Sequence, residues 1–287
     1  MITITGATGA LNGRTADLLL GDLDPSELTV VVRDPARAAR FAEAGVTVLE
    51  GRYEDPAGLR HAFEGADRLL LVSSSDPAAD AVALHRGAIE AAVAAGVGHI
   101  LYTSHQGAHA ASPFPPARDH AATEEILAAS AVPWTSLRNG FYAHSLPWLL
   151  GPWRETGMVS VPADGPVSWT SRDDAAEAAA VLLRSAALPT GPLTLTATDA
   201  PLFASVTARL AAARGQDIGF EIVDSEDWVR AWVDAGQPEG RARFSLGVFQ
   251  AAAQGLFGDT APALRDLLGR EPASVSEVVE SLVERAA

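Results

Sequence analysis

Short apolar runs alternate with segments of helical periodicity along the first half of this chain. The runs are rich in valine, isoleucine, leucine and threonine, as buried strands are, and the segments between them place apolar residues three and four positions apart. The predicted strands are residues 2–5, 28–32, 46–50, 69–72, 99–103 and 132–138. The predicted helices are residues 11–19, 35–44, 56–63, 79–95 and 120–130. This alternation predicts an α/β fold of the Rossmann type, with a doubly wound, mostly parallel sheet covered on both faces.

The first turn between strand and helix carries the clearest functional signal. Residues 6–9 read Gly-Ala-Thr-Gly, and the second predicted strand follows, as in a βαβ unit that binds a dinucleotide. Gly6 permits a tight turn, while Gly9 lets the backbone approach phosphates at the start of a helix. The pattern is irregular, because Asn12 stands where a third glycine is expected and Gly13 follows one place late. An ordinary turn of small residues is the alternative, but its position favours dinucleotide binding.

Beyond residue 140 the alternation becomes irregular and aromatic residues become denser. One more strand is predicted at residues 193–198, and amphipathic helices are predicted at residues 203–214 and 275–284. We therefore expect a dinucleotide-binding domain at residues 1–140 and a smaller α/β substrate lobe at residues 141–287, with segments that return to the sheet. The helix at residues 120–130 is expected to begin after Asp119 as its N-cap.

Composition removes several classes of function. The net charge of −15 argues against a nucleic-acid surface, and no apolar run reaches the roughly 18 residues that a membrane span needs. There is no cysteine, and all 21 basic residues are arginine, which excludes a catalytic thiolate, a lysine Schiff base and a Tyr-x-x-x-Lys pair. No spacing of histidine and acidic residues predicts a metal site. We expect a cytoplasmic protein without a secretory signal, acting on a small molecule, and we leave a homodimer open.

Ligands of parallel sheets bind beyond the carboxyl ends of the strands, so the residues that follow each predicted strand are candidates. After the second strand stands Arg33, whose guanidinium matches a ribose 2′-phosphate, whereas an acidic residue would accept from a 2′-hydroxyl. A solvated loop arginine is the alternative. The remaining strand ends carry Arg52-Tyr53, Ser73-Ser74-Ser75, Tyr102-Thr103-Ser104 and Asn139-Gly140-Phe141-Tyr142.

Several motifs together resemble the NmrA-like, atypical short-chain dehydrogenases, and among them the type-2 NADPH-dependent quinone oxidoreductases. They are TGATG, Arg33 after the second strand, LLLVSSS, YTS, EEILAAS followed by TSLRNGFY, and TSRDDAA. They keep their order over nearly the whole chain, and LRNGFY is more specific than the glycine turn. The resemblance implies an extended Rossmann domain with a small C-terminal lobe, NADPH as cofactor and a two-electron reduction of quinones.

The resemblance also implies a cofactor site. The phosphate turn would comprise Gly6, Ala7, Thr8, Gly9, Ala10 and Leu11, closed by Asn12. Arg33 would bind the 2′-phosphate, Ser73, Ser74 and Ser75 would line the ribose, and Asn139, Gly140, Phe141 and Tyr142 would lie near the nicotinamide. Residues 168–172, ending in Arg172, would close over the cofactor from the second lobe.

The chain departs from the wider superfamily at the catalytic positions. By its spacing to Glu124, His120 falls where active dehydrogenases have lysine, and Pro116 stands at the tyrosine position. If His120 faces the cofactor, Glu124 lies one helical turn along and could orient it; facing solvent is the alternative. His120, Ser104 and Tyr142 are the candidate catalytic residues, and water is another source of a proton.

Two functions fit these observations. The leading one is an NADPH-dependent reductase of a quinone or similar planar electrophile, whose hydroquinone could then react with oxygen, as in a monooxygenase without flavin or metal. Five aromatic residues could form a wall for a polycyclic polyketide-like substrate, although packing is the alternative role for the tryptophans: Phe141, Tyr142, Trp148, Trp153 and Trp169. The other function is a non-catalytic NADP(H)-sensing regulator of the NmrA type.

Overall fold

A computed structural model describes residues 1–74, 76 and 78–284. The chain forms two compact units. The first unit comprises residues 1–105, 119–138 and 172–193, and the second comprises residues 106–118, 139–171 and 194–287. Neither unit is a single stretch of sequence, because the chain passes from one to the other several times.

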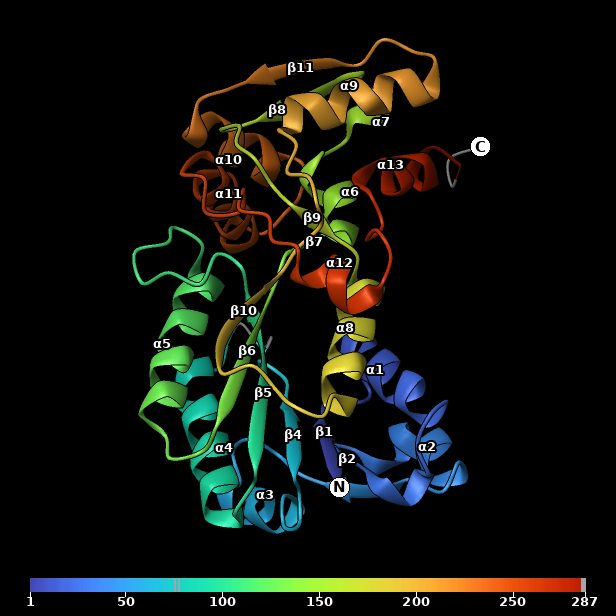
Figure 1. Cartoon of the computed structure of the whole chain (residues 1–287). Coiled ribbons are helices and arrows are strands. Elements are labelled where there is room, and N and C mark those ends of the chain that lie inside the picture. The colour runs from blue at the N-terminus through green and yellow to red at the C-terminus, as the bar shows by residue number, and fades with distance from the viewer. Residues whose placement is uncertain (75, 77, 285–287) are drawn as a thin grey trace. The chain divides into compact units, whose positions relative to one another are not determined.

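The first unit is built on a seven-stranded sheet with the order β10-β6-β5-β4-β1-β2-β3 (Figure 1). Its central pairings, β3 with β2, β2 with β1, β1 with β4 and β4 with β5, are parallel. The strands are β1 (Ile2–Thr5), β2 (Leu28–Val32), β3 (Thr47–Glu50), β4 (Arg68–Leu71), β5 (His99–His105), β6 (Trp134–Asn139) and β10 (Gly191–Leu195). β1 and β2 are buried throughout, as expected of strands covered on both faces.

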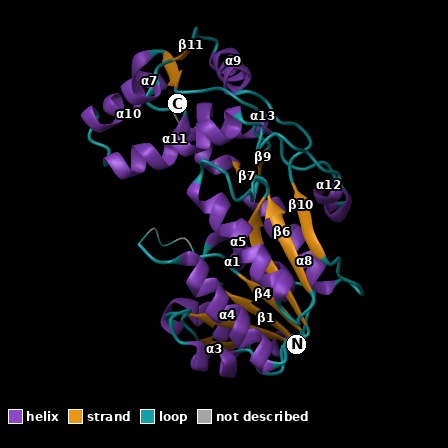
Figure 2. Cartoon of the chain, turned by 90° about the vertical axis from the view of Figure 1, so that its left-hand side faces the viewer, coloured by secondary structure: helices purple, strands orange, loops and turns teal. Residues whose placement is uncertain are grey.

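Helices cover both faces of this sheet (Figure 2). On one face α1 packs against α8, and on the other α3 packs against α4. The helices are α1 (Ala10–Leu20), α2 (Ala39–Glu43), α3 (Pro56–Ala62), α4 (Ala81–Ala95), α5 (Pro115–Ala129) and α8 (Arg172–Arg184), with 3-10 turns η1 (Pro25–Glu27) and η2 (Pro35–Ala38). The predicted fold class, a Rossmann-type parallel sheet between helical layers, is confirmed.

The second unit holds two small parallel sheets, β7 (Phe141–Tyr142) with β9 (Trp169–Thr170), and β8 (Met158–Val161) with β11 (Gly219–Ile222). Its core is one apolar cluster rich in aromatic rings. The helices are η3 (Ala143–Ser145), α6 (Leu146–Leu149), α7 (Trp153–Thr156), α9 (Phe203–Arg214), α10 (Ser225–Asp234), α11 (Glu239–Ala253), α12 (Ala263–Leu268) and α13 (Val275–Glu284).

Element boundaries differ from the predictions at four informative places. α5 begins at Pro115, so Asp119 lies inside the helix and is not its N-cap. Prolines are tolerated in a first turn, where backbone N–H groups have no helical partner, and the predicted start overlooked this. β5 runs two residues beyond the predicted strand and ends at His105, while β10 ends at Leu195 rather than at residue 198. Residues 35–38 form a 3-10 turn before the short helix α2.

Candidate active site

The turn after β1 has the geometry of a phosphate cradle. Gly6 adopts φ +66°, and a Cβ there would lie 2.7 Å from Val72 Cγ1, so any other residue would be strained and crowded. The Gly9 N–H donates to Gly6 O at 2.9 Å, and Gly9 then caps α1 without a side chain. The first N–H groups of a helix have no helical acceptors, so the start of α1 suits a phosphate. Ala7 packs inward, while Thr8, Gly9 and Ala10 are exposed and Leu11 is partly buried.

The irregular third glycine has a structural reason. A Cβ at Gly13 would lie 2.7 Å from Ala7 O, so Gly13 lets α1 pack closely against the turn. Asn12 is buried, and its Nδ2 donates to Thr5 O at 2.8 Å, which ties α1 to the end of β1. The shifted glycine pattern is therefore compatible with the turn, and Asn12 stabilises it through its hydrogen bond to Thr5.

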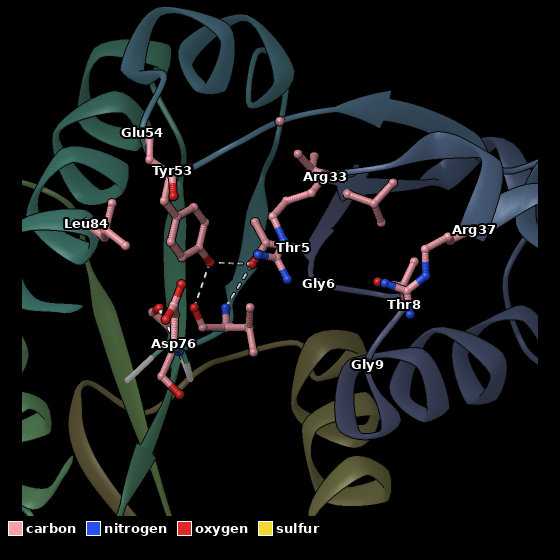
Figure 3. A pocket seen from close by; sticks show the side chains of 16 residues that line it. Thr5, Gly6, Thr8, Gly9, Arg33, Arg37, Tyr53, Glu54, Asp76 and Leu84 are labelled. Atoms are coloured by element: carbon pink, nitrogen blue, oxygen red, sulfur yellow. Dashed lines mark hydrogen bonds between the residues drawn. The ribbon is translucent and has the colours of Figure 1, made fainter. Parts of the chain in front are cut away.

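A cavity of about 520 Å³ opens beside this turn within the first unit (Figure 3). Arg33 and Arg37 both line it, and their side chains have no hydrogen-bond partner among the residues that the structure describes. Arg52 is different, because it pairs with Glu50 at 3.2 Å and donates to Arg33 O. Two exposed cations facing one cavity beside a phosphate cradle fit the 2′-phosphate of NADPH. Arg33 is the residue that the sequence predicted to bind this phosphate, and Arg37 lines the same cavity.

The opposite wall of the cavity is more deeply packed. Tyr53 points into it and its O–H donates to Val72 O at 2.6 Å, with Thr5 Oγ1 at 2.9 Å (Figure 3). Burial raises the pKa of the Tyr53 phenol well above its usual value. Ser73 and Ser74, two of the three serines predicted to line the ribose, line this cavity. The third, Ser75, lies outside the described residues. Tyr53 was visible in the sequence only as a residue after a strand.

The carboxyl end of β5 holds a cluster of aromatic polar side chains. Tyr102 is buried, and its hydroxyl lies 2.9 Å from His120 Nδ1 on α5 and 3.4 Å from His85 Nδ1 on α4. The ring of His105 is stacked on that of His120, with centroids 6.3 Å apart. Burial lowers the pKa of His85 and of His105 to about 4, and it lowers that of His120 well below its usual value. These histidines are neutral at physiological pH.

Glu124 does not orient His120, and that expectation is wrong. The Glu124 carboxylate accepts from Ser104 Oγ at 2.8 Å, from Ser136 Oγ at 2.6 Å and from the guanidinium of Arg138. His120 and Glu124, one helical turn apart, thus belong to separate clusters. His120 contacts Tyr102 on β5, whereas Glu124 binds serines of β5 and β6. His120 is partly buried against Tyr102 and does not face only solvent. The Ser104 hydroxyl proton is held by a buried carboxylate, which weakens its candidacy as an acid.

The remaining predicted site residues lie elsewhere. Arg172 begins α8 in the first unit. In the second unit, Asn139 Nδ2 donates to Tyr142 Oη at 3.2 Å, and the Gly140 N–H donates to Leu195 O. A Cβ at Gly140 would lie 2.0 Å from Thr170 Oγ1, so glycine is required there for packing against β9. Gly140 thus has a packing role, and a larger residue there would disrupt the pairing of β7 with β9.

Most of the expected aromatic wall belongs to a core, so that expectation is wrong for three residues. Phe141, Trp153 and Trp169 are buried in the second unit, at 8%, 2% and 1% exposure. Phe141 and Trp169 pack edge to face with centroids 5.7 Å apart. Tyr142 and Trp148 remain partly exposed, and Trp148 packs against Trp232. Aromatic density in the sequence marked packing here.

Two kinds of feature are absent from the described part of the chain. No group of three or more histidine, aspartate or glutamate residues is arranged to hold a metal ion. Among the same residues, no helix has both the length and the apolar character to cross a membrane.

Comparison with known proteins gives one consistent result. A family model described as NAD(P)H-binding matches residues 6–186. Quinone oxidoreductase 2 of Escherichia coli K12 is 33% identical over 98% of each chain. The crystal structure of the NADPH-dependent quinone oxidoreductase of E. coli with NADPH has a TM-score of 0.90, with 98% and 99% of the chains covered.

Two further solved structures are similar to this chain at lower sequence identity. Triphenylmethane reductase of Citrobacter sp. with NADP(H) is 29% identical, with a TM-score of 0.88 and complete coverage of both chains. Nmra, a negative transcriptional regulator, is 18% identical with a TM-score of 0.74 over 99% and 96% of the chains, which shows a common fold alone. The predicted family and the NADPH prediction agree with these findings. The chain belongs to the NmrA-like, NAD(P)H-binding family of atypical short-chain dehydrogenases and is an NADPH-using oxidoreductase of the quinone oxidoreductase type.

Proposed function

We propose that the protein reduces a quinone by two electrons, with NADPH as the hydride donor. The carrying observation is the cavity of the first unit, where the glycine turn faces the same space as two arginines that have no partner among the described residues. Kinship with quinone oxidoreductase 2 over 98% of both chains supports the substrate class. A nucleotide carrying both a pyrophosphate and a 2′-phosphate fits the cradle and the cations together.

The chain's own residues have a limited chemical task. NADPH supplies a hydride when bound, and the N–H groups at the start of α1 and the arginines beside it would hold its phosphates. Quinones accept hydride readily because reduction restores an aromatic ring, so placement supplies much of the rate. The histidine and proline at positions 120 and 116 fit a reaction without a strong acid. We propose that His120 faces the substrate oxygen, and Tyr142 stays a proposed substrate contact.

The direct test measures loss of the nicotinamide absorbance with one-, two- and three-ring quinones. Turnover with any of them, at a rate above that of NADPH and quinone alone, supports the proposal. Tight NADPH binding without turnover of any quinone would instead favour the alternative, a dinucleotide-sensing regulator.

Cofactor choice provides an independent test. We expect Arg33→Ala to remove most of a preference for NADPH over NADH of at least about tenfold, or about 1.4 kcal/mol, because a guanidinium–phosphate bond is lost. Binding constants of both cofactors, measured by fluorescence titration, check this. Arg60→Ala is the matched control, since Arg60 lies on α3 and does not line the cavity, and it should leave the ratio within about twofold. Equal affinities of the unchanged protein for both cofactors would contradict the expectation.

A narrower proposal concerns the product. Fused-ring hydroquinones are electron-rich and pass electrons to oxygen, so this reductase could prime a polycyclic substrate for oxygenation. The chemistry of the product supports it, and Tyr142 and Trp148 are the aromatic residues left to contact such a ring. A flat kcat/KM across ring sizes would remove the fused-ring part, and the absence of oxygen uptake during turnover would remove the priming part.

A further inference from the structure

The hydrogen bonds of His85, a neighbour of Tyr102, show which of its ring nitrogens carries the proton. The backbone N–H of Ser74 can only donate, and its acceptor at 2.8 Å is His85 Nε2. Because His85 is neutral and its Nε2 accepts, its proton lies on Nδ1. That Nδ1–H donates to Thr123 Oγ1 at 2.8 Å. Thr123 in turn donates its own proton to Asp119 O at 2.7 Å.

This excludes His85 as an acceptor of the Tyr102 proton. The phenol has one proton and two histidine neighbours, His85 Nδ1 at 3.4 Å and His120 Nδ1 at 2.9 Å. His85 Nδ1 is already a donor, so it cannot accept from the phenol. Of the two nitrogens, only His120 Nδ1, the nearer one, can accept from the Tyr102 O–H. Thr123 Oγ1 also neighbours the phenol, and it is the rival acceptor that the experiment must exclude.

A neutral imidazole that accepts at Nδ1 carries its proton on Nε2. Nε2 of His120 has no hydrogen-bond partner among the residues that the structure describes. His120 stacks on His105, the last residue of β5, so this N–H stands at the carboxyl edge of the sheet, where ligands bind.

We infer that Tyr102 is a positioning residue that holds His120 as the Nε2–H tautomer, so that a neutral N–H faces the oxygen of the substrate. The inference rests on the proposed quinone reduction. It assigns a function to a tyrosine that is entirely buried and cannot itself touch a ligand.

The chemical step follows from this arrangement. Hydride addition to a quinone makes one quinone oxygen anionic as the ring becomes aromatic. The Nε2–H of His120 donates a hydrogen bond to that oxygen and keeps its proton, and water then protonates the anion to give the hydroquinone. A neutral histidine with a lowered pKa suits this task, because it stabilises negative charge without changing its protonation state.

The tautomer can be measured before any substrate is added. Long-range proton–nitrogen correlation spectra of the 15N-labelled protein show which ring nitrogen of each histidine carries the proton. The His120 signals are assigned from their loss in His120→Gln. We expect the Nε2–H form in the unchanged protein and a substantial Nδ1–H population in Tyr102→Phe. An Nδ1–H form in the unchanged protein would overturn the inference, because the Tyr102 proton would then go to Thr123.

Kinetics test whether Tyr102 acts through His120. Tyr102→Phe should lower kcat with a naphthoquinone about tenfold while leaving the KM for NADPH unchanged. In the His120→Gln background, whose amide needs no tautomer control, the same change should lower kcat less than twofold. Equal losses in both backgrounds would show a merely structural role. His99→Gln, at the opposite end of β5, is the control and should leave kcat within twofold.

The two proposals fail in different ways. If no quinone is reduced, the proposed function fails and the catalytic part of the inference fails with it, whereas the NMR spectra still decide the tautomer. If quinones are reduced and Tyr102→Phe turns over normally, the proposed function stands and the positioning role of Tyr102 is overturned. A kcat that is flat between pH 5.5 and 8 supports a neutral donor, and a rise of kcat as protonation of His120 increases would contradict it.

Discussion

Two polar clusters lie on the same pair of elements, β5 and α5. They differ in how their buried polar groups are compensated. The cluster at Glu124 is charged, and every oxygen of its carboxylate is bonded to serine or arginine. The cluster at His120 is neutral and ends in an N–H without a partner among the described residues. The carboxylate of Glu124 has all its hydrogen-bond partners within the protein and therefore serves structure. The neutral cluster keeps one N–H group available and can also bind a ligand.

The largest expected effect breaks the charged cluster. Glu124→Gln should lower the free energy of unfolding by about 3 kcal/mol, because Arg138 is left half-buried without its carboxylate. Urea unfolding followed by fluorescence measures this. The double variant Glu124→Gln/Arg138→Leu should recover part of the loss. A loss below about 0.5 kcal/mol would show that solvent screens the pair.

The neutral cluster should make the free energy of unfolding depend on pH. Folding holds the pKa of His85 at about 4, against about 6.5 when the chain is unfolded, so the unfolded state binds more protons as pH falls between these values. Its contribution is present above pH 6.5 and is lost as pH falls toward 4, by about 2 kcal/mol at pH 5.

Urea midpoints of the unchanged protein and of His85→Gln, measured at pH 7.5 and pH 5, test this expectation. The variant should lose less stability between the two pH values than the unchanged protein. Equal losses of stability in the two proteins would contradict a contribution of His85 to the response to acid.

The smallest effect concerns one bond inside the neutral cluster. Thr123→Val keeps the shape of the side chain but removes the acceptor of the His85 Nδ1–H, which should cost about 1 kcal/mol of unfolding free energy. Ser136→Ala is the matched change in the charged cluster and should cost more, because it removes a bond to a charged group. The reverse order would contradict the contrast between the clusters.

The sequence predicted local features better than contacts between distant segments. The β1–turn–α1 unit follows from neighbouring residues and is confirmed, and α3 and α4 lie within one or two residues of their predicted ranges. The partners of His120 and Glu124 were missed, because helical spacing says that two residues share a face but not which strand lies beneath each. Tyr53 was named as a residue at a strand end, but its bonds to Thr5 and Val72 join segments far apart in the sequence and were not predicted.

Burial of the aromatic residues also could not be read from their order. Phe141 follows a strand end, as a ligand contact would, yet it packs against Trp169 and Phe257. The prediction for Asp119 failed on a simpler point, because Pro115 and Pro116 start α5 one turn earlier than an N-cap pattern suggests.

The first turn of α5 also limits what this scaffold can become. Pro116 stands where dehydrogenases of the wider superfamily, by the resemblance, place a catalytic tyrosine, and His120 stands at the position of their lysine. Reinstalling that pair would remove a proline from the start of a helix and set an ammonium group against the Tyr102 hydroxyl and the His105 ring. We expect the lysine to be the harder change to accommodate, because a buried ammonium group loses its hydration. An engineer who wanted that pair in this protein would therefore have to change the surroundings of position 120, Tyr102 and His105 included.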